Sequence, residues 1–588
     1  MIKHTFSTLP LLICIVLVTA SCDPQPATPE ATKPLSREIL EPATLVLRGG
    51  KVVTVDEAIG DVEAIAVRGH EIVATGSSRD IASLIGPETQ VIELEGRFVM
   101  PGFIEGHGHY LYLGTTQQIL DLGSARSWDE IVHQVAEAAA GATPGDWIQG
   151  FGWHQEKWIR VPEGAVDGVP RNDHLNQVAP DNPVILTHAS GHASMANDAA
   201  LASAGIGDLT DDMPGGTIVR TSEGKATGLL RETAQNPVKA AMGAWESQRS
   251  AETREAELRE RAQLAAWEAL RHGVTSFHDA GTSFADIDFL KELEAEGRLP
   301  VRLYVMVRYE SIENMDARLP EYRMLSEEND FLTVRSIKKQ VDGALGSHGA
   351  WLLEPYFDMG DTAGLVLDPI EEIERTAEIA IKHGFQVNTH AIGDRANREI
   401  LDLYQRAFVS HDMDGTELRW RMEHAQHLDP ADVPRFAELG VLASMQGVHA
   451  TSDGPWLPSR LGEKRTRETS YVWRDLLNSG ARINNGTDVP VESIDPIASF
   501  HASVSRMMNN GERLTPGQAM SRQEALESYT INNAYAAFEE DIKGTLTPGK
   551  LADMVVLSQD IMTIPEEKIP ETQVEVTIVG GEIQYRIE

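Results

Sequence analysis

Cysteine is almost absent from this 588-residue chain. Its two cysteines, Cys14 and Cys22, both lie near the N-terminus, so the rest of the chain has no disulfide and depends on its core for stability. Positive charge is also scarce, because 51 lysines and arginines face 89 aspartates and glutamates, which gives a net charge of −38. Such a chain repels phosphate, so nucleic acid and anionic lipid surfaces are poor candidates as partners.

Long apolar runs are lacking too. The most apolar stretch, from Leu9 to Val18, is too short to span a bilayer as a helix. It follows a basic residue, Lys3, and runs into TASC, which resembles a lipoprotein export signal, although threonine stands where such signals usually carry leucine. We therefore predict a signal peptide over residues 1–21, a tether over 22–41 and a periplasmic protein that reaches the membrane only through a lipid on Cys22.

Two β-rich ends flank a different middle. Residues 42–100 and 541–588 contain short Val- and Ile-rich runs broken by glycine turns, which predicts one β-sandwich built from both ends. The middle, residues 101–540, alternates helix-like and strand-like segments, as in EEIERTAEIAIKHG followed by FQVNTHAIGD. This alternation, with polar residues where strands end, predicts a (β/α)8 barrel of the TIM type rather than an open sheet. Residues 121–235 are rich in Gly, Asp and Pro and break the rhythm, so we predict an insertion that caps the barrel mouth.

Histidines and acidic residues stand at the predicted strand ends. In PGFIEGHGH, His107 and His109 are two residues apart, so a strand places both imidazoles on one face. Neutral imidazole is the commonest metal ligand in proteins. Other predicted strands end in the same way, at His390, His424 and Asp488, and at Lys338 or Lys339 in a strand leading to Asp342. Each alone could be a core histidine or a cap residue, but together they predict a metal site.

Several phrases occur in the order found in the metal-dependent amidohydrolase superfamily. They are PGFIEGHGH, GVTSFHDAG, KKQVDGALGSHGA, NTHAIGD, MEHAQH, NGTDVPV and YTINNAYAAFEEDIKGTLTPGKLADMVVL. The sequence from Thr44 onward resembles this superfamily, and most of all its large-insert branch with N-substituted formamide deformylases and YtcJ-like proteins. The resemblance implies that one or two zinc ions are held by His107, His109, Lys338, His390, His424 and Asp488.

The resemblance also implies roles within that set. Lys338 matches a lysine that carboxylation turns into an anionic bridge between two metals; the alternatives are a plain salt bridge and the neighbouring Lys339. Asp488 matches an aspartate that takes a proton from the attacking water and returns it to the leaving amine. A divalent ion would lower the pKa of that water and polarise the substrate carbonyl.

Some residues outside the ligand set are candidates for substrate binding. Gln446 stands where similar proteins often have Gln-Pro, and His348 stands where relatives commonly have arginine. His192 lies in LTHASGHASMAND of the predicted insertion. A polar loop explains Gln446 and its neighbour His449 equally well. The aromatic residues of FGWHQEKW either form a pocket wall or pack in the interior.

These observations predict an enzyme that hydrolyses a C–N bond in an amide-like, N-acyl or N-formyl small molecule. One alternative is a deaminase acting on an amidine-like carbon. Another is a non-catalytic periplasmic binding protein on the same scaffold, against which Asp488 argues because a binding protein needs no proton shuttle. The sequence leaves the oligomeric state open, with a homodimer as one option.

Overall fold

The computed structural model describes residues 41–326 and 330–587. The predicted signal peptide, the lipid site at Cys22 and all but the last residue of the predicted tether lie outside these residues. Three separate β-sheets account for the strands of the described chain. None of the helices in these residues is both long enough and apolar enough to cross a membrane.

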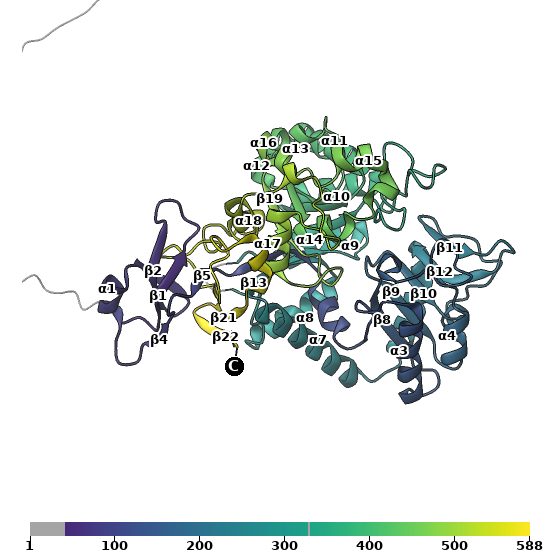
Figure 1. The fold of residues 1–588 in the computed structure, drawn as a ribbon, viewed down its shortest axis with the longest axis horizontal. Helices are drawn as coiled ribbons and strands as arrows, with labels where there is room; N and C mark the ends of the chain where they lie inside the picture. The colour runs from purple at the N-terminus through teal and green to yellow at the C-terminus, as the bar shows by residue number, and fades with distance from the viewer. Residues whose placement is uncertain (1–40, 327–329, 588) are drawn as a thin grey trace, which may run out of the picture. The chain divides into compact units, whose positions relative to one another are not determined.

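The central sheet is the predicted parallel barrel (Figure 1). Its strand order is β6, β13, β14, β15, β16, β17, β18 and β19, each paired in parallel with the next. The strands are β6 (Phe103–Gly108), β13 (Val274–Thr282), β14 (Arg302–Val307), β15 (Leu332–Gln340), β16 (Gln386–Ala391), β17 (Arg421–His424), β18 (Leu442–Gln446) and β19 (Ile483–Gly486). Nearly all of their residues are buried, as expected for strands covered on both faces. The prediction of a (β/α)8 fold is confirmed.

Helices connect the barrel strands and cover them. The main ones are α7 (Ala251–Arg271), α8 (Phe284–Ala295), α9 (Ile312–Tyr322), α10 (Ile370–His383), α11 (Asp394–His411), α13 (Val433–Leu439) and α16 (Trp473–Ser479), and α17 (Pro496–Ser505), α18 (Arg522–Ser528) and α19 (Ile531–Ala536) follow the last strand. Serine side chains accept from backbone N–H groups at the starts of α7, α8 and α9. Glycines in the left-handed backbone conformation end α10, α13 and α16, and after each of these helices the chain turns directly into the next strand.

The barrel closes where β6 meets β19. The Asn533 side-chain amide spans this seam by donating to the carbonyl oxygens of Ile104, at 2.6 Å, and Asn485, at 2.8 Å. The two strands approach so closely that a Cβ on Gly106 would lie 2.4 Å from the Asn485 carbonyl oxygen. A side chain at position 106 would therefore push the two strands apart, which explains why this residue is glycine.

Both ends of the described chain build the flanking sheet. Its order is β22, β21, β20, β5, β1, β2 and β3, with β4 paired to β1, so the C-terminal strands form one block that joins the N-terminal block where β20 pairs with β5 (Figure 1). The strands are β1 (Leu45–Val53), β2 (Asp61–Arg68), β3 (Glu71–Gly76), β4 (Gln90–Glu93), β5 (Phe98–Pro101), β20 (Met554–Leu557), β21 (Val574–Val579) and β22 (Glu582–Arg586). Leu45 and Leu47 pack in one cluster and Val46 in another, so the sheet has an apolar core on each face.

The third sheet lies in the segment predicted as an insertion, apart from Leu120 at its start. Its order is β11, β12, β10, β9, β8 and β7. The strands are β7 (Leu120–Asp121), β8 (Ile148–Trp153), β9 (Val184–His188), β10 (Ala193–Ala196), β11 (Gly216–Arg220) and β12 (Ala226–Glu232), with helices α3 (Trp128–Gly141), α4 (Asp173–Val178) and α5 (Asp198–Ser203) between them and α6 (Asn236–Glu246) after them. Trp153 and Trp158 stack in the core of this part, with ring centroids 5.9 Å apart. Of the two interpretations of FGWHQEKW, interior packing therefore holds for the tryptophans.

Candidate metal centre

The end of β6 brings His107 and His109 to one point, as the i, i+2 spacing predicted. Their rings lie edge to face with centroids 5.8 Å apart. The Nε2 atom of His107 lies 3.6 Å from Asp488 Oδ1, and that of His109 lies 3.3 Å from the same oxygen. Asp488 follows β19, so residues far apart in the sequence meet where the first and last barrel strands end.

Asp488 is fixed by its backbone as well as by its side chain. Its N–H donates to the His107 carbonyl oxygen at 2.8 Å, and its φ is 58°, a left-handed conformation that is unusual for a residue with a side chain. His424 has a φ of 74°. Conformations of this kind cost about 1–3 kcal/mol each and are concentrated at functional sites, where the surrounding structure enforces them.

His390 and His424 complete the group of imidazoles. His390 ends β16 and His424 ends β17, and their ring centroids are 4.5 Å apart. One atom each from His107, His424 and Asp488 lie within 4.8 Å of one another. The Nε2 atom of His390 is buried and has no hydrogen-bond partner among the described residues.

The protonation states suit metal binding. Burial lowers the pKa of His424 to about 3 and lowers the pKa of His107 and His390 well below the usual value, so the imidazoles are uncharged. Burial opposes ionisation of Asp488, but the contacts with His109 and His107 prevail and hold the pKa of this carboxyl well below its usual range. Neutral imidazole and ionised carboxylate are the forms that bind divalent cations.

The structure separates the two adjacent lysines of β15. Lys338 faces the barrel interior, where its Nζ lies 3.1 Å from His107 Nε2. Lys339 faces the surrounding helices and pairs with Glu372 at 2.6 Å and with Asp368 at 3.4 Å. Burial lowers the pKa of Lys338 to about 7, so a large share of this amine is uncharged at neutral pH. Of the two lysines, Lys338 is therefore the one that lies beside the imidazoles.

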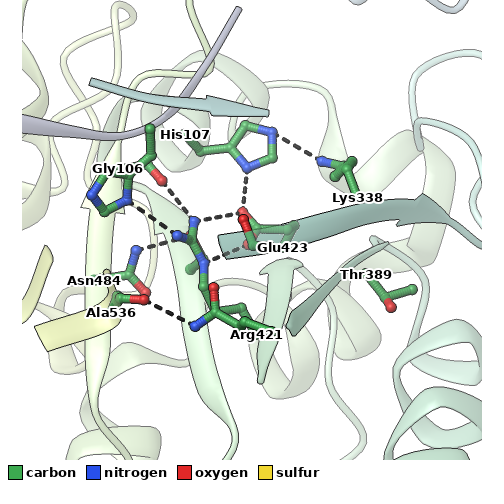
Figure 2. A network of polar contacts seen from close by, with 12 residues as sticks. Gly106, His107, Lys338, Thr389, Arg421, Glu423, Asn484 and Ala536 are labelled. Atoms are coloured by element: carbon green, nitrogen blue, oxygen red, sulfur yellow. Dashed lines mark hydrogen bonds and ion pairs between the residues drawn. The ribbon is translucent and has the colours of Figure 1, made fainter. Parts of the chain in front are cut away.

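A buried ion pair behind His107 was not found by sequence reasoning. Glu423 contacts Nδ1 of His107, and Arg421 binds the other carboxylate oxygen through Nε at 2.6 Å (Figure 2). Arg421 also donates to the Gly106 carbonyl oxygen at 2.7 Å and to Ser444 Oγ at 2.8 Å. Both partners of the pair are fully buried. A carboxylate on Nδ1 leaves Nε2 as the free nitrogen, which fixes the ring orientation for metal binding.

This pair carried a weak sequence signal. Arg421 and Glu423 are two residues apart in RMEH, so they share one face of a strand. Two charged residues on a fully buried strand must pair with each other or with the site. The sequence does not show that this strand is buried, because burial depends on the folded barrel.

A second buried carboxylate fixes the strand that carries His107. Glu105 accepts hydrogen bonds from the backbone N–H of Thr487, at 2.7 Å, and from that of His107, at 3.2 Å. Burial raises the pKa of Glu105 to about 8. The side chain therefore links β6 to the turn before Asp488, and it is not directed at the metal centre.

A cavity of about 1220 Å³ opens above the centre. The barrel supplies one wall, and the insertion supplies another through His154, His188, His192 and Glu232. His192 lies over His390, with ring centroids 5.7 Å apart, and its Nδ1 is 2.7 Å from Glu232 Oε2. His192 therefore lines the cavity, and its contact with substrate stays a prediction.

The other two predicted substrate contacts lie elsewhere. The Oε1 atom of Gln446 is 2.8 Å from His424 Nδ1, which places this side chain behind the imidazole as an orienting partner. His348 lies beside Asp358, with Nε2 at 3.2 Å from both carboxylate oxygens. Neither side chain lines the cavity, so a direct contact with substrate stays a prediction for both. His449 does line it, and its Nε2 is buried without a partner among the described residues.

The donor set fits a divalent cation. Uncharged imidazoles, one ionised carboxylate and the buried Nε2 of His390, which makes no hydrogen bond within the described residues and has Asp342 Oδ1 at 3.5 Å, converge at the carboxyl ends of parallel strands, which is where barrel enzymes hold their active sites. Without a cation these groups would leave buried polar atoms unsatisfied.

Comparison with known proteins agrees with this geometry. The profile of the Amidohydrolase family matches residues 90–585. The chain belongs to the amidohydrolase family. Because its members are metal-dependent, this membership supports a metal-dependent hydrolase that acts on C–N bonds.

Relatives of this amidohydrolase span almost the whole chain. The protein LONG AFTER FAR-RED 3 of Arabidopsis thaliana is 33% identical, with 92% of each chain covered. The putative amidohydrolase YtcJ of Bacillus subtilis is 30% identical over 92% of this chain and 99% of its own. N-substituted formamide deformylase of Arthrobacter pascens is 28% identical over 92% and 98%. The predicted resemblance to these last two proteins is confirmed.

A solved structure shares the fold of the amidohydrolase. An uncharacterized metal-dependent hydrolase from Pyrococcus horikoshii superposes with a TM-score of 0.70 and 26% identity, covering 89% of this chain and 99% of that chain.

Proposed function

We propose that the protein hydrolyses an amide-like or N-acyl C–N bond in a small molecule. The observation that carries this proposal is the position of Asp488, a carboxylate kept ionised between His107 and His109 at the floor of the cavity. Hydrolysis of an amide needs such a group, because a proton must leave the attacking water and reach the departing amine. The cavity is large enough for a substrate of drug-like size.

One or two zinc ions are the proposed cofactor. The residues that would hold them are His107, His109, Lys338, His390, His424 and Asp488. A bound divalent ion supplies Lewis acidity, which polarises the scissile carbonyl and lowers the pKa of the attacking water.

The residues of the chain divide the remaining work. Asp488 accepts a proton from water as the water oxygen bonds to the carbonyl carbon, and it donates that proton to the amine nitrogen as the C–N bond breaks. Glu423 keeps His107 in one tautomer and orientation. His192, held by Glu232, reaches into the cavity from the insertion and contacts the bound substrate.

Lys338 is proposed to carry a carboxylate. An uncharged amine can add to CO2 with loss of a proton, which turns a cation into an anionic ligand. Burial favours the uncharged amine, and Nζ already lies beside His107.

The proposal is tested by product analysis on protein purified without chelators and loaded with zinc. A panel of N-acyl and N-formyl amines should release an amine and a carboxylate, whereas a deaminase would release ammonia from amidine-like substrates. Asp488→Asn should lower kcat by about 10²–10⁴-fold, the usual contribution of a general acid–base group. Asp129→Asn is the matched control, because Asp129 is exposed on α3. Binding without turnover of any member would favour the non-catalytic alternative.

The location of the protein is a separate proposal. We propose an export signal and a lipid on Cys22, which would place the enzyme in the periplasm, attached to the membrane through residues 22–41. A homodimer stays an option for the folded part.

A further inference from the structure

His449 carries a buried nitrogen that the metal centre does not use. Three residues that line the cavity have a buried side-chain atom that makes no hydrogen bond within the described part of the chain: His390 at Nε2, Asp488 at Oδ1 and His449 at Nε2. The first two atoms have ion-pair contacts within the centre, with Asp342 at 3.5 Å and with His109 at 3.3 Å. The His449 nitrogen has none. Because buried polar atoms are almost always satisfied in native proteins, this nitrogen indicates a bound partner.

The proton on the His449 ring is placed by the neighbouring Gln426. The Nε2 amide of Gln426 lies 3.0 Å from Nδ1 of His449. An amide NH2 group can only donate, so Nδ1 accepts, and the proton of the neutral imidazole is then on Nε2. The buried nitrogen of His449 is therefore a hydrogen-bond donor without an acceptor.

The imidazoles proposed to bind metal have the opposite arrangement. Nδ1 of His107 faces the Glu423 carboxylate. Nδ1 of His424 lies 2.8 Å from Oε1 of Gln446. Both partners accept hydrogen bonds, so the proton is on Nδ1 and Nε2 keeps the lone pair that a cation needs. The donor behind the His449 ring takes this lone pair away from the cavity, so His449 is not a further metal ligand.

His449 lies beside the metal centre. It belongs to α14 (Gly447–Asp453), which starts directly after β18. Its ring is nearly parallel to that of His424, with 20° between the planes and 6.3 Å between the centroids. Both side chains line the same cavity, so a small molecule bound at the centre lies next to His449.

We propose that the Nε2–H group of His449 donates a hydrogen bond to the carbonyl oxygen of the substrate's acyl group. This donor stabilises the negative charge that develops on that oxygen when water adds to the carbonyl carbon, as a preorganised N–H group does in an oxyanion hole. The proton stays on Nε2 throughout, while Asp488 moves the proton of the attacking water. His449 is then a catalytic residue, and the inference rests on the proposed function.

The same donor selects between substrate classes. An amide presents an oxygen that accepts a hydrogen bond. A protonated amidine presents N–H groups in the same place, and these would leave the buried donor of His449 unsatisfied. The geometry therefore favours an amide over the amidine-like substrate of a deaminase.

Kinetics with 4-nitroacetanilide and 4-nitroformanilide test the donor, since their hydrolysis releases coloured 4-nitroaniline. In the zinc-loaded full chain, His449→Phe keeps a flat ring without the N–H group and should lower kcat by about 10²–10³-fold at unchanged zinc content. His449→Gln restores an N–H donor and should recover most of this loss. His133→Phe and His133→Gln are the matched controls, because His133 is exposed on α3, and both should behave as wild type.

NMR of protein labelled with nitrogen-15 histidine reads the tautomer without turnover. The His449 signals are identified by their loss in His449→Gln. We expect them to show a proton on Nε2 and none on Nδ1. Acetate carries the acyl oxygens of the hydrolysis product, so its addition should shift the Nε2–H resonance of His449.

The inference and the proposed function can fail separately. An unprotonated Nε2, an unchanged kcat in His449→Phe, an equal loss of kcat in the Phe and Gln variants, or a loss of zinc from His449→Phe would overturn the inference. Absence of anilide turnover by wild type, together with a shift of the Nε2–H resonance by acetate, would support the donor and count against amide hydrolysis. Absence of both turnover and shift would overturn both.

Discussion

The buried carboxylate of Glu423 contacts Nδ1 of His107, and both side chains are at most 1% exposed. Arg421 compensates the charge of Glu423 from the opposite side. The orientation of the first metal-binding histidine is therefore set by an ion pair in the barrel interior, and a change in that pair must be felt at the metal centre.

Glu423→Gln is expected to weaken zinc binding by about 10–100-fold, the usual effect of losing a carboxylate behind a metal-binding histidine. It should also lower the free energy of unfolding, because Arg421 would keep a buried charge without its partner, at a cost of about 3–5 kcal/mol. Zinc affinity by chelator competition and stability by urea titration measure the two effects. Glu372→Gln, which affects only the outward-facing Lys339, is the control, and equal zinc affinity in both variants would contradict this role for Glu423.

Adjacent lysines offer a second contrast. Lys338→Met should remove most of the bound metal, with affinity lower by at least about 100-fold, whereas Lys339→Met should keep it and lose only about 1 kcal/mol of stability from its partly exposed ion pairs. Metal analysis of both variants checks this. Mass spectrometry of the native protein should find one added CO2 on the peptide with Lys338; its absence, together with full metal content in Lys338→Met, would restore the salt-bridge interpretation.

Two glycines should respond in opposite directions to alanine. Gly106→Ala places a Cβ 2.4 Å from the Asn485 carbonyl oxygen at the barrel seam, so the free energy of unfolding should fall by about 1–3 kcal/mol or more. Gly243 lies inside α6 with open space around it, so Gly243→Ala should raise stability by up to about 1 kcal/mol. The midpoints of urea unfolding test both signs, and a tolerated Gly106→Ala would mean that the seam can separate.

The two cysteines test the proposed anchor. Cys22→Ser should abolish labelling with palmitate and move the protein from the membrane fraction to the soluble fraction, since a lipid on Cys22 would be the membrane contact. Cys14→Ser removes the other thiol and should leave both readouts unchanged. Retention of Cys22→Ser in the membrane would argue for a different attachment.

The sequence predicted those parts of the site that coincide with local pattern. His107, His109, His390 and His424 stand at strand ends, and the barrel brings strand ends together whatever the details of packing. Asp488 was found for the same reason. The choice between Lys338 and Lys339 could not be made with certainty, because it depends on which face of β15 is turned inward.

What could not be predicted depends on burial and on distant contacts. Arg421 and Glu423 have the polarity of surface residues, and only the closed barrel buries them. His192 and His390 come from separate parts of the chain, and their rings meet only after the insertion has folded over the barrel. The direction of the His348 side chain follows from loop conformation, which composition does not encode.

The flanking sheet has a consequence for synthesis. Strand β5 leads directly into the first barrel strand, yet one of its hydrogen-bonded neighbours is β20, which leaves the ribosome only after the entire barrel has been made. On a growing chain the edge of β5 is therefore unpaired, and an unpaired strand edge invites contact with other chains. The flanking sheet is complete only when β20 has been translated and pairs with β5. A chain truncated before β20 would therefore keep the barrel strands but leave one edge of β5 unpaired and prone to aggregation.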